Sequence, residues 1–191
     1  TLTTLEEEGP NGRYHQLAQG NLSRWKQEAE QWLPNRTGPP ACDVRLESDD
    51  WGVVTGSLTK EFGQTFAVLN MAHPSHPGGG YAKGLAAQEE NMFRRTDCHY
   101  SLVHGKVVDS SRPREYYADI TDLLEGIDGR VYLDTQSPRV CIRGPEDERA
   151  ADLGYKWLPD DDIFPFYELR SAAMNLHHPA THYDHDEMRH R

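Results

Sequence analysis

The chain has 191 residues, 36% of them hydrophobic, and a formal net charge of −11 at pH 7. This length favours one compact domain over two. The acidic excess argues against binding of nucleic acid or of an anionic membrane through clustered Lys and Arg side chains. No stretch is long and apolar enough to span a membrane and no secretory leader is seen, so we expect a cytoplasmic protein, and a monomer.

The cysteines exclude two common kinds of stabilisation. Cys42, Cys98 and Cys141 are odd in number and contain no CxxC spacing. They therefore predict neither a disulfide framework nor a zinc knuckle, and they favour a reducing compartment.

The first third of the chain predicts one helix clearly. Residues 21–33, "NLSRWKQEAEQWL", carry apolar residues at helical spacing behind Asn21 as a predicted cap, and Pro34 follows. We expect an N-terminal helical segment over residues 1–40 and a main domain over 41–191. Within that domain, residues 42–48 predict a short strand, whereas 52–62 fit a strand or a helix equally well.

A buried strand is predicted over residues 65–72, "TFAVLNMA", because a nearly continuous apolar run is typical of a strand covered on both faces. The loop "HPSHPGGGYAKG" follows directly. Helix-forming residues return in "LAAQEENMFRR", so a helix is expected to begin near Gly84 or Leu85. In α/β sheets ligands bind at the carboxyl ends of strands, which is where this loop would lie.

The remaining elements are less regular. Residues 114–129 predict a helix and a turn, and residues 129–143 predict two strands separated by "SP". The stretch "DIFPFYELRSAAMNL" predicts a loop followed by a helix from about Tyr167.

A candidate site lies between the predicted strand and the helix after it. Gly78, Gly79 and Gly80 allow positive φ and a close approach of backbone N–H groups to a ligand. Glu89 and Glu90 follow, and a carboxyl group near the leaving oxygen is what cleavage of a glycosidic bond requires. Taken alone, the glycines also fit a surface turn, and the glutamates also fit a solvated helix face.

The whole segment "VLNMAHPSHPGGGYAKGLAAQEENMFRR" resembles the signature of the bacterial-type poly(ADP-ribose) glycohydrolases, a branch of the macrodomain superfamily. That signature consists of three glycines, a spacer of six to eight residues and Gln-Glu-Glu. The spacer here, Tyr81 to Ala87, has seven residues. The resemblance covers residues 65–103 firmly.

The resemblance implies a three-layer α/β/α sandwich with a mixed sheet that binds ADP-ribose. Gly78, Gly79 and Gly80 would border the distal ribose and the diphosphate, and Asn70 would contact the distal ribose. Gln88 and Glu89 would help to place the ribose, and Glu90 would be the principal acid. The family's second glycine-rich loop has no counterpart after Gly154, so either the domain is truncated at its C-terminus or another loop substitutes.

The implied activity is hydrolysis of the bond at the distal ribose C1″ of ADP-ribosylated proteins, with no metal and no cofactor. Two alternatives stay open: a module that binds ADP-ribose without cleaving it, and a metal-dependent hydrolase that uses the C-terminal tail. The bond that is cut, to ribose, Ser or Arg, is not indicated. The aromatic candidates for an adenine pocket are Tyr116, Tyr117, Phe164 and Phe166, and the metal-ligand types of the tail are His177, His178, His182, Asp184, His185, Asp186 and His190.

Overall fold

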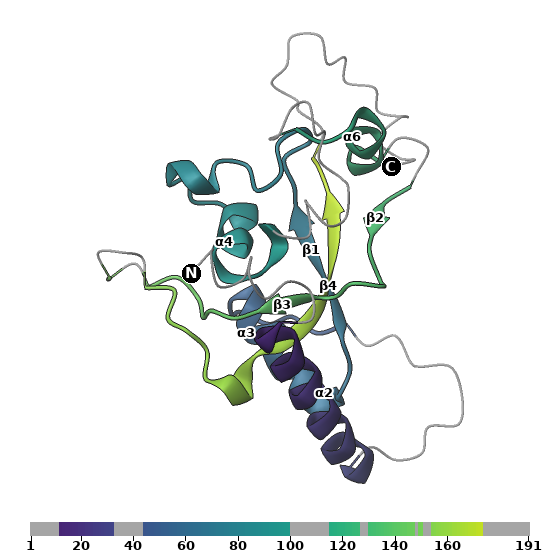
Figure 1. The fold of residues 1–191 in the computed structure, drawn as a ribbon, viewed down its shortest axis with the longest axis vertical. Coiled ribbons are helices and arrows are strands. Elements are labelled where there is room, and N and C mark those ends of the chain that lie inside the picture. Colours follow the sequence, from purple (N-terminus) through teal and green to yellow (C-terminus); the bar gives the residue numbers. More distant parts are fainter. Residues whose placement is uncertain are drawn as a thin grey trace.

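The computed structural model of the protein describes residues 12–32, 44–99, 115–126, 130–147, 149–150 and 154–173. Its centre is a four-stranded mixed sheet (Figure 1). Strand β4 pairs in parallel with β1 and antiparallel with β2 and β3. The predicted α/β fold with a mixed sheet is confirmed. The strands are β1 (Phe66–Met71), β2 (Tyr132–Leu133), β3 (Arg139–Cys141) and β4 (Phe164–Ser171).

Helices and short 3-10 turns connect and cover these strands. The main hydrophobic cluster joins Trp25 of α2, Trp51 of α3 and Met92 of α4 to Val68 and Phe166 of the sheet. The helices therefore share one core with the sheet. They are α2 (Arg13–Trp32), α3 (Trp51–Phe62), α4 (Gln88–Arg95) and α6 (Ala118–Leu124), with 3-10 turns η2 (Tyr81–Lys83) and η4 (Asp160–Asp162).

The central strand, β4, is where the sequence prediction failed. A helix was expected from about Tyr167, but residues 164–171 are extended. Phe164, Phe166, Glu168 and Arg170 alternate along β4 and are all buried. Because two of these four positions are charged, the apolar alternation that marks a strand is hidden in the sequence.

Strand β1 was correctly placed, but its burial differs from the prediction. Val68 and Asn70 are buried, whereas Ala67, Leu69 and Met71 are exposed. The expectation of a strand covered on both faces is therefore wrong for the described structure. An apolar run does not distinguish a strand buried on both faces from one with an exposed apolar face.

The segment after the glycines also differs in detail. The predicted helix start near Gly84 or Leu85 is wrong, because α4 begins at Gln88. The preceding residues form η2, which ends at Gly84 with φ 81°. This left-handed residue stops the turn and lets the chain enter α4 from a new direction.

At the N-terminus, α2 extends well beyond the predicted limits. It starts at Arg13, so Asn21 is not its cap but an inner, buried residue. The Asn21 Nδ2 group donates to the carbonyl oxygens of Asp160 and Ile163, at 2.8 and 2.9 Å. Asn21 therefore ties α2 to the chain just before β4.

Residues 52–62, which fitted either element, are helical in α3, with Asp50 as the N-cap. The described part of the strand predicted at 42–48 is irregular. The helix predicted within 114–129 is α6, and the two strands predicted within 129–143 are β2 and β3.

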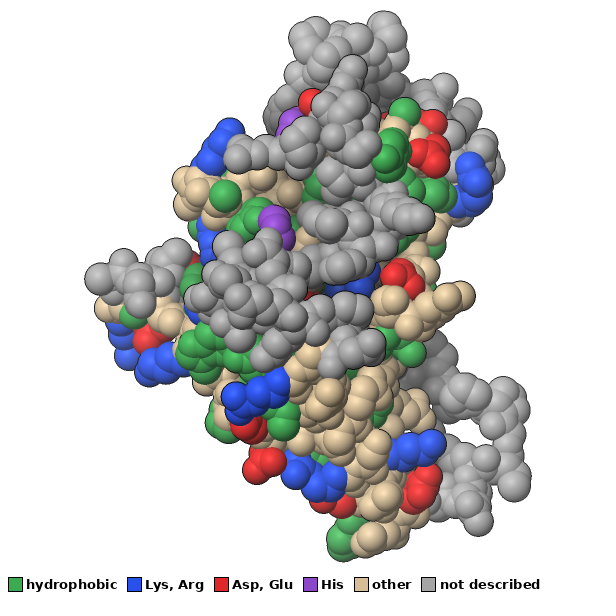
Figure 2. All heavy atoms as spheres, in the orientation of Figure 1, with side chains coloured by type: hydrophobic (Ala, Val, Ile, Leu, Met, Phe, Trp, Pro, Cys, Tyr) green, Lys and Arg blue, Asp and Glu red, His purple; other side chains and the backbone are tan. Residues whose placement is uncertain are grey.

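Surface charges are mixed around α2. On the face shown in Figure 2, basic and acidic side chains lie next to one another over the lower half of the molecule. Arg13 and Lys60 make ion pairs of 2.6 Å with Asp160 and Asp162. Within the described ranges, no helix combines the length and apolar character needed to cross a bilayer.

The two faces of the sheet predict different responses to truncation. Phe166→Ala removes a fully buried ring and should lower the free energy of unfolding by about 3–5 kcal/mol. Leu69→Ala, at a side chain that is 49% exposed, should cost less than about 1 kcal/mol. Urea unfolding of both variants provides the comparison, and equal losses would contradict the described packing.

Candidate active site

The triple glycine forms a turn that is packed tightly against α4. Gly78 and Gly79 have φ values of 73° and 52°, in the region that side chains disfavour. A Cβ at Gly78 would collide with the rings of Phe93 and Tyr81, and one at Gly79 would collide with the Glu90 carboxylate. Glycine is therefore needed at both positions for the loop to lie this close to the helix.

The two glutamates of α4 point their carboxylates into this loop. The Gly78 N–H donates to Glu89 Oε1 and the Gly80 N–H donates to Glu90 Oε1, each at 2.9 Å. Both side chains are buried, with 3% and 7% exposure for Glu89 and Glu90. Adjacent helical residues point about 100° apart, yet both reach the loop because they bind different backbone amides.

The two carboxylates differ in how fully they are engaged. Glu89 accepts a second hydrogen bond, from the His73 N–H to Oε2 at 2.8 Å. Among the described residues, by contrast, no hydrogen bond occupies Oε2 of Glu90. Glu90 therefore has a carboxyl oxygen available to a ligand, and Glu89 is held in place at both oxygens.

Burial raises the pKa of Glu89 to about 7, with smaller contributions in the same direction from the nearby charges of Glu90 and Glu168. The hydrogen bonds from His73 and Gly78 oppose the shift without cancelling it. A carboxyl group with this pKa retains a proton in a substantial fraction of molecules at neutral pH. The site can therefore hold a proton where a solvated glutamate pair would not.

Gln88 joins α4 to β1. Its Oε1 accepts from the Met71 N–H at 2.9 Å, and its Nε2 donates to the Leu69 carbonyl at 2.7 Å. This side chain thereby fixes the first turn of α4, and with it Glu89 and Glu90, against the strand. The contact of Gln88 with a ribose stays a prediction.

Two arginines at the end of α4 hold the site from the other side. The Arg95 guanidinium, 1% exposed, forms an ion pair of 2.8 Å with Asp50, the N-cap of α3. Arg94 Nη2 donates to the carbonyls of Tyr81 and Leu85, at 2.9 and 2.6 Å. Nothing in the sequence indicated a role for this pair, which fixes both the helix and the turn that follows the glycines.

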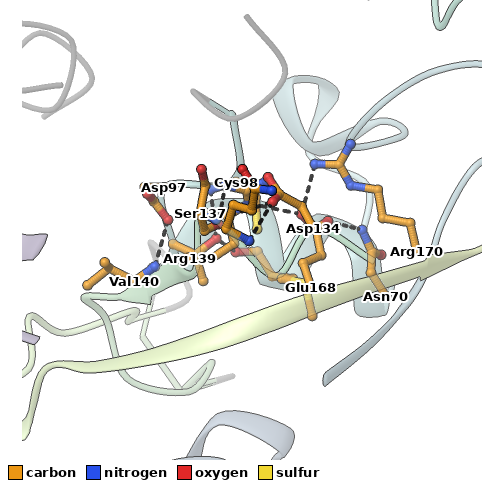
Figure 3. A network of polar contacts seen from close by, with 12 residues as sticks. Asn70, Asp97, Cys98, Asp134, Ser137, Arg139, Val140, Glu168 and Arg170 are labelled. Atoms are coloured by element: carbon orange, nitrogen blue, oxygen red, sulfur yellow. Dashed lines mark hydrogen bonds and ion pairs between the residues drawn. The ribbon is translucent and has the colours of Figure 1, made fainter. Parts of the chain in front are cut away.

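Asn70 lies in a buried polar network that the sequence did not indicate (Figure 3). Its Nδ2 donates to Glu168 Oε1 at 2.7 Å. Glu168 Oε2 accepts from Arg170 at 2.8 Å and from Arg139 at 3.4 Å. In "FPFYELR" a single residue separates Glu168 from Arg170, which would place both on one face of a strand, but this spacing alone is too short a pattern to predict the strand.

The candidate aromatic residues for an adenine pocket lie in different environments. Phe164 and Phe166 are core residues, 3% and 0% exposed, so this role is wrong for both. Tyr116 is also buried, whereas Tyr117 is 37% exposed. The histidine-rich tail lies outside the described residues. Within the described part of the chain, no group of three or more potential ligands is placed to hold a metal ion.

An α/β domain with two buried carboxylates under a glycine-rich loop has the features of a ligand-binding domain equipped for acid–base chemistry. A sequence comparison gives its family. The model of the microbial-type PARG catalytic domain matches residues 10–121, more than half of the chain. The protein therefore belongs to the microbial-type PARG catalytic domain family.

Similar solved structures include the poly(ADP-ribose) glycohydrolase of Thermomonospora curvata, at 18% identity and a TM-score of 0.48. The match covers 90% of this chain and 61% of that one. A second structure of that enzyme, bound to the inhibitor ADP-HPD, matches at 19% identity and a TM-score of 0.45, over 90% and 59% of the two chains. The chain thus spans about three fifths of these structures. No curated protein matches it in sequence.

The tight contact at Gly79 can be tested against a second glycine of the same loop. Gly79→Ala and Gly84→Ala both place a Cβ at positive φ, but only the first also displaces the Glu90 carboxylate, since no described residue lies within 4 Å of a Cβ at Gly84. Each should lose about 1–2 kcal/mol of unfolding free energy through backbone strain, and Gly79→Ala should lose more. Thermal or urea unfolding measures both, and a smaller loss for Gly79→Ala would contradict the packed loop.

The raised pKa of Glu89 predicts a pH dependence of stability. The folded state holds this proton to a higher pH than the unfolded state, so the stabilisation is complete below pH 4.5 and is lost as pH rises through about 7. Relative to Glu89→Gln, the wild type should lose up to about 3 kcal/mol over this window. Urea unfolding at pH 5 and pH 8 checks this, and a constant difference between the two proteins would exclude the raised pKa.

Proposed function

We propose that this protein is an ADP-ribosyl glycohydrolase, a hydrolase that cleaves the glycosidic bond at the distal ribose C1″ of mono- or poly-ADP-ribose on proteins. The observation that carries the proposal is the pair of buried carboxylates under the glycine loop, one of which has an oxygen with no hydrogen bond from any described residue. Membership of the family supports the substrate class. Cleavage of a glycosidic bond needs a carboxyl group at the leaving atom.

Glu90 is the proposed general acid. It donates a proton to the oxygen or nitrogen that leaves C1″ as the glycosidic bond breaks through an oxocarbenium-like transition state. The resulting carboxylate then takes a proton from the water that attacks C1″, which regenerates the acid. Glu90 suits this role because its Oε2 has no hydrogen bond from the described residues, and because burial keeps competing water away.

The other site residues bind and orient in this proposal. Glu89, fixed at both oxygens, positions the ribose and keeps a proton beside Glu90. Asn70 and Gln88 contact or support the distal ribose, and the glycines border the ribose and the diphosphate. The glycine N–H groups already donate within the protein, to the two glutamates at Gly78 and Gly80 and to the His76 carbonyl at Gly79, so in this proposal the loop borders the ligand through its close-packed backbone.

No metal and no cofactor takes part in the proposed chemistry. The partners are ADP-ribose and ADP-ribosylated proteins, acted on by a cytoplasmic monomer with no membrane or nucleic-acid contact. We retain the proposed division into a helical segment, residues 1–40, and a catalytic domain, residues 41–191. The division is one of sequence only, because Trp25 of α2 belongs to the main core.

The acid is tested by Glu90→Gln, which keeps the size of the side chain and an acceptor for the Gly80 N–H but removes the transferable proton. Release of free ADP-ribose from substrates linked through ribose, Ser or Arg should fall on the order of a hundredfold or more. ADP-ribose affinity, measured by calorimetry, should change by less than about 1 kcal/mol. Full turnover by Glu90→Gln would refute the assignment.

The same assay separates the alternatives. A wild type that binds ADP-ribose but releases none from any linkage would be a binding module. A chelator that abolishes turnover, with activity restored by zinc, would indicate a metal-dependent enzyme. Loss of turnover in His182→Ala as well would place the metal site in the histidine tail. We expect neither treatment to change the rate.

A further inference from the structure

The amide of Asn70 is held in one orientation by its surroundings. Asn70 is fully buried, and its Nδ2 donates to Glu168 Oε1 at 2.7 Å (Figure 3). Its Oδ1 has no hydrogen-bond partner among the described residues. A buried polar atom without a partner requires an explanation, and a hydroxyl that donates to it is one that fits an amide oxygen.

The charge state of Glu168 decides which end of the amide faces it. Burial alone would raise the pKa of this carboxyl, but Arg170 and Arg139, together with the hydrogen bonds from Arg170 and Asn70, hold the pKa below its ordinary value. An ionised carboxylate only accepts hydrogen bonds. Asn70 must therefore turn its NH2 group to Glu168 and its oxygen away.

The two oxygens of Glu168 have separate tasks. Oε1 accepts from Asn70, and Oε2 accepts from both arginines. The arginines and the Asn70 NH2 group are all donors, so an ionised Glu168 satisfies them together. The arginines thereby set the orientation of Glu168, which in turn sets that of the Asn70 amide.

We propose that Glu168 is a positioning residue that presents Asn70 Oδ1, and not Nδ2, as the acceptor for a hydroxyl of the distal ribose. The inference rests on the proposed function, since it assumes that the ligand carries this ribose. Asn70 offers an acceptor because its Nδ2 is engaged by Glu168 while its Oδ1 has no partner among the described residues, and a hydroxyl can donate to such an oxygen.

Glu168→Gln should reverse the amide without removing a side chain. The arginines force the oxygen of the introduced amide toward themselves, so the NH2 group of that amide meets Asn70. Asn70 must then turn its oxygen inward and present a donor to the ligand. We expect on the order of tenfold weaker binding of ADP-ribose by calorimetry.

The reciprocal variant restores the arrangement. In Asn70→Asp combined with Glu168→Gln, the introduced amide donates to the introduced carboxylate, and the amide oxygen still accepts from the arginines. One oxygen of the new carboxylate remains for the ligand, and the pair keeps its charge. Affinity should return to within about threefold of the wild type, whereas Asn70→Ala should stay on the order of tenfold weaker. A merely structural role for Glu168 would give no such rescue.

A matched control removes a charge from the same network without touching Asn70. Asp134 contacts Arg139 at 3.5 Å, and its Oδ1 accepts from the Gln136 and Ser137 N–H groups. Asp134→Asn keeps that acceptor and should leave ADP-ribose affinity within about twofold. A tenfold loss here would mean that the network acts through its charge, and it would overturn the role given to amide orientation.

The outcomes separate the two proposals. A wild type that does not bind ADP-ribose overturns the proposed function and this inference with it. A wild type that binds, with equal affinity in folded Glu168→Gln, overturns only the role of Glu168. If Glu168→Gln fails to fold, the reciprocal variant decides, since binding no tighter than in Asn70→Ala overturns the inference.

Discussion

The site depends on hydrogen bonds between the backbone of the glycine loop and the first turn of α4. The amides of Gly78 and Gly80 reach the two carboxylates only because no Cβ separates the loop from the helix. These bonds compensate part of the cost of burying two adjacent acids, and the raised pKa of Glu89 shows that the compensation is incomplete. The buried Glu89 carboxyl group therefore keeps a proton near neutral pH, and groups with perturbed pKa values of this kind are common at functional sites.

Three side chains of α4 fix the helix and the glycine loop to the neighbouring elements. Gln88 ties the start of α4 to β1, Arg95 ties its end to the N-cap of α3, and Arg94 holds the turn that follows the glycines. An eight-residue helix has little stability of its own, so α4 depends on these side-chain contacts for its stability. The precision of the site is thus a tertiary property, although its residues are contiguous in sequence.

That contiguity explains what the sequence could predict. Strand β1, the glycine loop and the two glutamates follow one another within a short segment, so local pattern and family resemblance were sufficient to find them. Glu168 and Arg170 come from β4, which lies almost a hundred residues from Asn70, and their charge disguised the strand itself. The helix limits failed for a related reason, since Asn21 has a typical capping side chain but bonds instead to residues 160 and 163. Long-range pairing leaves no local signal.

The Gln88 side chain has a further consequence, for association between molecules. Within the described sheet β1 is an outer strand, and an outer strand offers unpaired amides and carbonyls to any other chain. Gln88 occupies the Met71 N–H and the Leu69 carbonyl, so the half of this edge nearest the site is already paired. The residue that orients α4 therefore also blocks strand addition beside an exposed apolar face, and its loss would create a place for edge-to-edge aggregation.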